Sequence, residues 1–401
     1  LHRFMILYTS LIDRIYQYLF IGSIFLLPLT VLGNNIFMWI AVILWLCSGD
    51  YLNKILALKE NKLVLASVIF FALHLLALLW TEDLLWGLEM TRKMLTFFLV
   101  LPIFLTISRK ENIKFYLYAF FIAISISEML SYLVWFEFLE PFGKATMFEP
   151  TPLMGHISYN PFLAFAIYLV SHQLIFEKSL SNLMRTLYTF FLISMTFNMF
   201  ITGGRAGQVM FFASLIVLSF QFFQKSQVKA SFMAIFLITV IAFSGYNYSP
   251  LFKNRITQIS YDLAKFTTNP NTSLGHRIIF SKNTIELIKS NPLIGVGTGD
   301  FPVEYSKINL VNSPKVKSTV HPHNMYLYVQ AQLGLIGLAS FLWIFYIQFN
   351  FAVKSKDQFV NHVGFALPFF FLIIMMSDAY LLGHFTSNLF ILFSAFIYSN
   401  K

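Results

Sequence analysis

The sequence predicts an all-α protein that crosses a membrane about twelve times. Three observations lead to this prediction. First, 57% of the 401 residues are hydrophobic and only 11% are charged, a composition far outside that of a soluble domain. Second, the apolar residues gather in runs that are long enough to span a bilayer. Third, these runs show no alternation with a period of two, so we expect helices rather than a barrel.

The expected spans follow one another closely along most of the chain. A bilayer core needs roughly 20 apolar residues per helix, which divides the sequence into about twelve runs. They are residues 15–33, 35–49, 62–80, 85–107, 113–137, 159–176, 184–202, 206–223, 230–248, 325–349, 362–380 and 384–400. The second and last runs are short, and the fourth carries Arg92 and Lys93. We expect a single membrane domain over residues 1–401, with one long polar loop at residues 249–324.

Basic residues in the short loops predict how the spans are oriented. They concentrate in one alternate set of loops, whereas the other set, which includes the predicted loop at Gly33 and Asn34, carries few. The basic set contains Lys54, Lys59, Lys62, Arg109, Lys110, Lys114, Lys178, Arg185, Lys225, Lys229, Lys354 and Lys356. With this set in the cytoplasm, both termini lie inside and the long loop lies on the opposite face. Membrane orientation thus explains much of the net charge of +10, and no nucleic-acid binding is expected.

The long loop carries positive charge that orientation does not explain. Residues 249–324 contain nine basic and four acidic side chains. The orientation rule acts mainly through short loops, so this surplus needs a separate reason. A positive surplus favours an anionic ligand.

Two arginines are candidates for binding that anion. Arg205 stands in the motif Thr-Gly-Gly-Arg-Ala-Gly at residues 202–207, between two expected spans. Glycines there let the backbone approach a ligand, and a helix N-terminus attracts phosphate. Arg277 lies just ahead of an expected amphipathic helix at residues 278–289. The alternatives are an Arg205 that reaches lipid headgroups and an Arg277 that is a solvated loop charge.

A glycine-rich segment follows that helix at residues 291–300, Asn-Pro-Leu-Ile-Gly-Val-Gly-Thr-Gly-Asp. It is not a dinucleotide-binding fingerprint, because it follows a helix rather than a strand and its glycine spacing differs. We expect a turn that folds the long loop back over the membrane.

His323 is the strongest candidate for catalysis. His321 precedes it by two residues, and Asn324 opens the next span. A neutral histidine at the membrane surface can act as a general base for a sugar hydroxyl. The two histidines could instead bind a metal, but no cysteine or close-packed carboxylate accompanies them, so no metal is expected. Asp378, near the outer end of a span, should have a partner such as an arginine or a histidine, because an unpaired carboxylate is costly there.

Together these features resemble the O-antigen ligase family, whose superfamily includes O-antigen polymerases and bacterial O-oligosaccharyltransferases. The resemblance rests on five motifs and covers roughly residues 190–345. The motifs are Arg205 in its glycine-rich segment, Gly275-His276-Arg277, the turn at Asn291-Pro292, His323-Asn324, and Gly334 in the span that follows.

The resemblance implies a membrane-embedded, GT-C-like glycosyltransferase that inverts the sugar and uses neither metal nor cofactor. It would transfer a glycan from undecaprenyl diphosphate to a sugar hydroxyl of lipid A-core, at the periplasmic face of the bacterial inner membrane. Arg205 and Arg277 match the diphosphate-binding arginines, and His323 matches the catalytic histidine. The supporting residues would be Asn324, Asp378, His321 and Gly334.

Other activities remain as alternatives within and outside the family. One dominant outer loop favours a ligase over a polymerase, because polymerases more often divide their outer residues between two large loops. The short chain after the last span disfavours a protein O-oligosaccharyltransferase. A transporter of lipid-linked sugars would carry charges within its spans and two related halves, and no internal repeat is evident.

Overall fold

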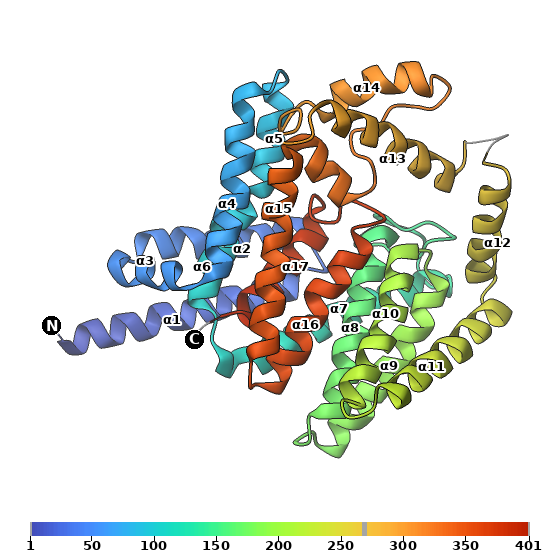
Figure 1. Ribbon diagram of the computed structural model, residues 1–401. Helices are drawn as coiled ribbons and strands as arrows, with labels where there is room; N and C mark the ends of the chain where they lie inside the picture. The colour runs from blue at the N-terminus through green and yellow to red at the C-terminus, as the bar shows by residue number, and fades with distance from the viewer. Residues whose placement is uncertain (1, 267–270, 400–401) are drawn as a thin grey trace. The chain divides into compact units, whose positions relative to one another are not determined.

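The computed structural model describes residues 2–266 and 271–399, and its regular elements in these ranges are helices (Figure 1). The one β-type pairing among the described residues is an isolated bridge between Thr146 and Glu149. The predicted all-α class is therefore confirmed.

The helices follow in order along the chain. They are α1 His2–Leu26, α2 Val31–Cys47, α3 Tyr51–Glu60, α4 Lys62–Leu76, η1 Ala77–Trp80, α5 Leu84–Leu95, η2 Thr96–Val100, α6 Leu101–Ile107, η3 Lys110–Asn112, α7 Ile113–Trp135, α8 His156–Phe176, α9 Asn182–Ile201, α10 Arg205–Phe222, α11 Gln227–Tyr248, α12 Pro250–Ala264, α13 Ser273–Ser290, α14 Phe301–Asn312, α15 Met325–Lys354, α16 Gln358–Ile374 and α17 His384–Ile397.

Six helical segments of the described chain are long and apolar enough to cross a membrane. They are Lys62–Trp80, Leu84–Ile107, Lys110–Trp135, Arg205–Phe222, Gln227–Tyr248 and Met325–Lys354. A seventh is added if α2 and α3, which are bent by 119° to each other, form one broken span. Helices α16 and α17 are apolar but shorter. The protein is thus a membrane protein by these segments, while the count of about twelve spans stays a prediction.

The first helix ends earlier than the sequence pattern predicts. The expected loop at Gly33 and Asn34 is wrong, because both residues lie inside α2. The chain turns instead at residues 27–30, around Pro28. Proline lacks a backbone donor and restricts the residue before it, so α1 stops there. Asn34 is nevertheless satisfied, since its Nδ2 donates to the carbonyl of Ser23 at 2.8 Å.

Contacts divide the chain into two compact units. Unit 1 comprises Leu1–Phe20, Met38–Asn112 and Ile259–Lys401, and unit 2 comprises Ile21–Phe37 and Ile113–Gln258. His323 therefore belongs to unit 1 and Arg205 to unit 2. The single domain over residues 1–401 and the outer position of loop 249–324 stay predictions.

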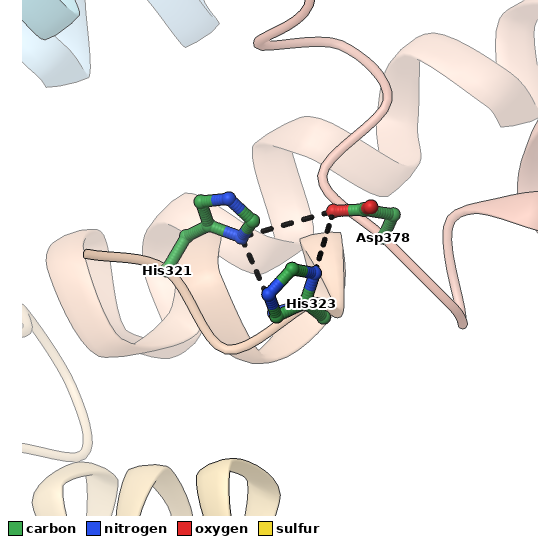
Figure 2. A group of neighbouring side chains, drawn as sticks. All are labelled: His321, His323 and Asp378. Atoms are coloured by element: carbon green, nitrogen blue, oxygen red, sulfur yellow. Dashed lines mark hydrogen bonds and ion pairs between the residues drawn. The ribbon is translucent and has the colours of Figure 1, made fainter. Parts of the chain in front are cut away.

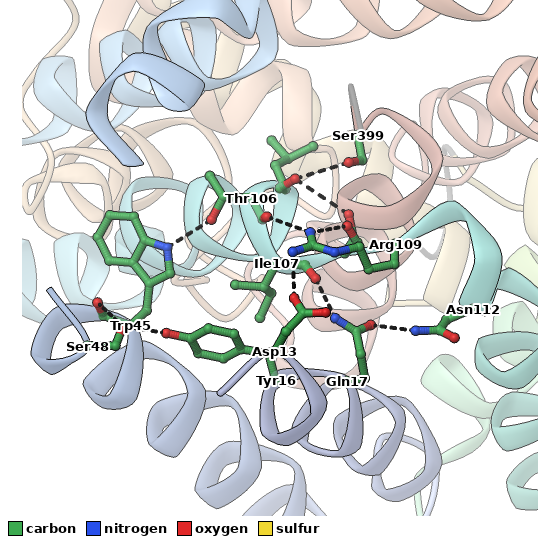
Figure 3. A network of polar contacts seen from close by, with 12 residues as sticks. Asp13, Tyr16, Gln17, Trp45, Ser48, Thr106, Ile107, Arg109, Asn112 and Ser399 are labelled. Atoms are coloured by element: carbon green, nitrogen blue, oxygen red, sulfur yellow. Dashed lines mark hydrogen bonds and ion pairs between the residues drawn. The ribbon is translucent and has the colours of Figure 1, made fainter. Parts of the chain in front are cut away.

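A network of polar contacts joins the two ends of unit 1 (Figure 3). Arg109 pairs with Asp13 of α1, and Trp45 Nε1 of α2 donates to Thr106 Oγ1 of α6 at 2.9 Å. Ser399, after α17, donates to the carbonyl of Leu105 at 3.1 Å. Because each polar atom finds a partner on another segment, these helix ends are fixed relative to one another.

Helix α15 is broken at Gly334, and the glycine-rich segment packs into the break. Gly334 has φ 65° and ψ −164°, and a Cβ there would lie 2.1 Å from the Leu293 carbonyl carbon. Backbone hydrogen bonds run in both directions: Val296 N donates to Ala331 O at 2.9 Å, and Leu335 N donates to Pro292 O at 2.9 Å. These bonds replace the ones that α15 loses at the break. Gly334 is thus explained by close backbone packing, which only glycine permits.

Candidate functional site

Asn324 fixes the start of α15, immediately after His323. Its side-chain oxygen accepts from the backbone N–H groups of Tyr326 at 3.0 Å and Leu327 at 3.1 Å, as an N-cap does. Its Nδ2 donates to the carbonyl of Met376, after α16, at 3.2 Å. Asn324 therefore holds the histidine end of α15 against the loop that contains Asp378.

His323 is held in an unusual conformation. Its φ is 52°, in the left-handed region that costs energy for a residue with a side chain. The ring of Phe280, from α13, stacks on the imidazole with a centroid distance of 5.8 Å and an interplanar angle of 17°. Strain of this kind persists only where surrounding contacts impose it, and it is typical of functional sites.

His321, His323 and Asp378 form a cluster between two loops (Figure 2). Asp378 Oδ1 lies 3.2 Å from His323 Nδ1 and 3.7 Å from His321 Nδ1. The carboxylate also accepts from the backbone N–H of Ala379 at 2.8 Å. Asp378 lies in the loop after α16, beyond the last helical residue Ile374, rather than within a span. The partner expected for this carboxylate is therefore a pair of histidines.

The cluster perturbs its own titration. Burial and the nearby charge of His323 lower the pKa of His321 below its ordinary 6.5, although Asp378 acts in the opposite direction. Burial would raise the pKa of Asp378, but the interactions with His323, the Ala379 N–H and His321 together outweigh it, and the pKa falls below the usual 3.8. Near neutral pH the cluster thus combines an ionised Asp378 with a neutral His321.

The same three side chains have the composition of a metal site. Each offers one ligand atom, and these atoms all lie within 4.8 Å of one another. The premise that no carboxylate accompanies the histidines is wrong, because the fold brings Asp378 to them from a distant part of the sequence. Two histidines and one carboxylate suit a divalent transition metal, so the absence of metal stays a prediction.

Arg277 faces the same loop as the cluster. It lies on α13, whose start is capped by Thr272, and it precedes Phe280 by three residues, so the two side chains share a face of the helix. Phe280 stacks on His323. Burial is the main reason why the pKa of Tyr380, two residues after Asp378, is raised. The positive charge of Arg277 acts against this rise. Arg277 therefore projects a cation toward the loop that carries Asp378.

Lys93 is a further cation near the cluster that no motif indicated. Its charge contributes to the lowered pKa of His321, and it lies 4.0 Å from Glu89 on α5. The available signal was the pair of basic residues, Arg92 and Lys93, inside an otherwise apolar run.

Arg205 starts α10 in unit 2, as the sequence predicts. Its Nη2 donates to Gln258 Oε1 at 3.0 Å. The glycines before and after it allow close packing inside unit 2. A Cβ at Gly204 or Gly207 would lie 2.5 Å or 2.3 Å from the Cβ of Asn160 on α8. Asn160 in turn donates to Thr202 Oγ1 at 2.9 Å.

Glu149 is the residue of unit 2 that sequence patterns missed. Its carboxylate accepts from Gly203 N at 2.8 Å and pairs with Arg255 Nη2 at 2.9 Å. His156 Nδ1 lies 3.7 Å away. The contact with Gly203 joins residues 54 positions apart, and no spacing rule connects them.

The structure thus groups the predicted residues unequally. His321, His323 and Asp378 meet, Asn324 fixes the adjoining helix, and Arg277 faces their loop. Gly334 shapes α15 farther along the helix. Arg205 lies in unit 2 with Glu149 close by.

The fold and these residues define a helical membrane protein with clusters of polar and charged side chains at the ends of its helices. Residues 190–342 match the model of the family described as O-antigen ligase. This region, which carries Arg205, Arg277 and His323, is similar to the O-antigen ligase family, and the predicted resemblance is confirmed over it. Among curated proteins, none matches the chain. The family match supports a function of the ligase or polymerase type, acting on a lipid-linked glycan and a lipid acceptor.

Proposed function

We propose that the protein is an O-antigen ligase. It transfers a glycan from undecaprenyl diphosphate to a sugar hydroxyl of lipid A-core, with inversion at the anomeric carbon and without a metal ion. The observation that carries this proposal is the 3.2 Å contact of His323 with Asp378, because His323 lies in the matched family region and faces a fixed carboxylate.

His323 is the general base in this proposal. Its Nδ1 faces Asp378, so a proton on Nδ1 is held by the carboxylate and Nε2 is left to accept the proton of the acceptor hydroxyl. Asp378 also stabilises the imidazolium that forms. Positioned general-base assistance of this kind contributes roughly 100- to 10,000-fold in rate.

The arginines supply charge for the leaving group. As the acceptor oxygen bonds to the anomeric carbon, the bond from that carbon to the diphosphate breaks and the electron pair goes to the diphosphate. A guanidinium matches phosphate oxygens with paired donors, which suits Arg277 and Arg205 for this role. Removing one such contact typically costs about 100- to 1,000-fold in rate.

The proposed location is the bacterial inner membrane, with the site at the periplasmic face and both termini in the cytoplasm. The basic short loops support this orientation. Helix α15 supports it further, because His323 precedes its first residue and Lys354, of the basic set, is its last.

An O-antigen polymerase, which would join carrier-linked repeat units, is the second candidate. It fits the same family match. One observation favours it: the segment between α7 and α8, which contains Glu149, is folded and contacts Arg255. In the proposed orientation, the outer residues would then come from two loops rather than one. Protein O-glycosylation and lipid-linked sugar transport are more distant candidates.

A deletion strain tests these functions. A ligase predicts unmodified lipid A-core together with polymer that accumulates on the carrier. Core that bears a single repeat unit would identify a polymerase instead. Complementation with the native chain should restore the full ladder on a lipopolysaccharide gel, and a ladder that persists in the deletion strain would contradict both assignments.

A further inference from the structure

Glu149 joins three separate elements of unit 2 through one carboxylate. Gly203 N, ahead of α10, lies 2.8 Å from Oε2, and Arg255 Nη2, from α12, lies 2.9 Å from Oε1. His156, the first residue of α8, lies 3.7 Å from Oε2. The Glu149 side chain is only 14% exposed, so these contacts are shielded from water and count for more than a surface ion pair does.

The loop that presents Glu149 is fixed by its own backbone. Thr146 N donates to Glu149 O at 2.9 Å, and Thr151 N donates to the same oxygen at 2.8 Å. Farther out, Lys144 N donates to Pro152 O at 2.9 Å across a turn in which Gly143 has φ 61°. The carboxylate is therefore presented by a folded loop rather than by a freely moving side chain.

Contacts through Glu149 and Arg205 close into a ring. Glu149 binds Gly203, which lies two residues before Arg205, and Arg205 donates to Gln258 at 3.0 Å. Gln258 and Arg255 are three residues apart on α12 and share a face of that helix. Arg255 then returns to Glu149. The ring therefore links Glu149 both to the backbone ahead of Arg205 and to the hydrogen-bond partner of its guanidinium.

The turn has no room to adjust around Glu149. A Cβ at Gly203 would lie 2.1 Å from Glu149 Oε1, so the carboxylate packs directly against the backbone. On the other side, Asn160 holds Thr202. The backbone that leads into Arg205 is thus held by Glu149 at Gly203 and by Asn160 at Thr202.

We propose that Glu149 is a positioning residue for the donor diphosphate, acting through Arg205. It holds the turn at residues 202–204 and the face of α12, so that the Arg205 guanidinium is oriented before the lipid diphosphate binds. Preorganisation lowers the cost of binding because the side chain need not be ordered at that moment. This inference rests on the proposed role of Arg205 in diphosphate binding.

A double-mutant cycle on the full chain in nanodiscs tests the coupling. The variants are Glu149→Ala, Arg205→Ala and the double variant, and the probe is undecaprenyl diphosphate. Glu149→Ala should raise the Kd of the probe and the donor KM about 10-fold, with acceptor KM nearly unchanged. Because both residues act through one guanidinium, the double variant should bind no more weakly than Arg205→Ala.

Two further variants guard against misfolding of Glu149→Ala. Glu149→Gln keeps an acceptor for Gly203 but loses the ion pair, so it should show a smaller rise in Kd. Arg255→Gln removes the same ion pair from the other side and should match it. Glu140→Ala, an exposed carboxylate of the same loop, is the control and should leave Kd unchanged.

The outcomes separate the two hypotheses. Additive losses in the cycle, or an unchanged Kd in all three variants of Glu149 and Arg255, would overturn the positioning role while leaving Arg205 assigned. An unchanged Kd in Arg205→Ala would overturn both the positioning role and the assignment of Arg205.

Discussion

His323 and Asp378 approach each other within 3.2 Å although one opens α15 and the other follows α16. Asn324, beside the histidine, donates to Met376 and so ties the two segments together. The pair is thus held by backbone and side-chain contacts on both sides, which is what a base and its orienting group require.

Replacing the carboxylate should disable the base without unfolding the site. We expect Asp378→Asn to lower kcat about 100-fold or more, because an amide can neither hold the reactive tautomer nor stabilise the imidazolium. KM for both substrates should change little, as measured by transfer with purified donor and acceptor. Glu304→Gln, a partly exposed carboxylate on α14 that pairs with Lys307, is the control. Full activity in Asp378→Asn would remove the pair from the mechanism.

Chelation distinguishes a base pair from a metal site at the same side chains. If His323 acts as a base, dialysis against EDTA should leave the rate unchanged, and added divalent ions should not raise it. A rate that falls on chelation and returns with one divalent ion would instead make His321, His323 and Asp378 metal ligands. Metal analysis of the purified protein provides an independent reading.

Activity should depend on the planar shape of the Arg277 guanidinium as well as on its charge. We expect Arg277→Ala to reduce kcat/KM for the donor about 100- to 1,000-fold. Arg277→Lys should recover only a minor part of this loss, because an ammonium cannot offer paired donors to phosphate oxygens. Lys282→Ala, an exposed cation on the same helix, should behave like the native chain. Equal rates for the lysine variant and the native chain would indicate a simple electrostatic role.

His321 should make stability depend on pH in a defined window. Its folded pKa lies below the ordinary 6.5, so the unfolded chain binds a proton first as the pH falls. The contribution of His321 to the free energy of unfolding is therefore fully present above about pH 6.5. It is lost as the pH drops toward the lowered pKa of the folded state. The corresponding loss for Asp378, whose pKa is lowered from 3.8, comes only at more acidic pH.

The variant His321→Asn tests this window. It removes the titrating group but keeps an acceptor near His321 Nδ1, to which His323 N donates at 3.3 Å. Thermal unfolding between about pH 8 and pH 5 should show a flatter pH dependence of Tm in the variant than in the native chain. Identical slopes would contradict the assignment of the lowered pKa to His321.

Local patterns in the sequence predicted the fold class and the individual residues far better than their partners. Apolar runs gave the helices, and glycine next to arginine marked the start of α10. The pairing of Asp378 with His323, and of Glu149 with Gly203, depends on segments that meet only in the folded chain. Periodicity carries no information about such contacts. Pro28, in contrast, is visible in the sequence itself. It ends α1, although the apolar residues around it had led us to extend the span to residue 33.

The break in α15 has a consequence for how the site comes into being. Residues 331–336 complete their backbone bonding only with residues 292–297, so the segment next to His323 cannot reach its final form as an isolated helix. Pairings between distant parts of a chain form late, because loop closure must precede them. On the proposed role of His323, docking of the glycine-rich segment would complete the helix that carries the base, and folding of the long loop would precede activity.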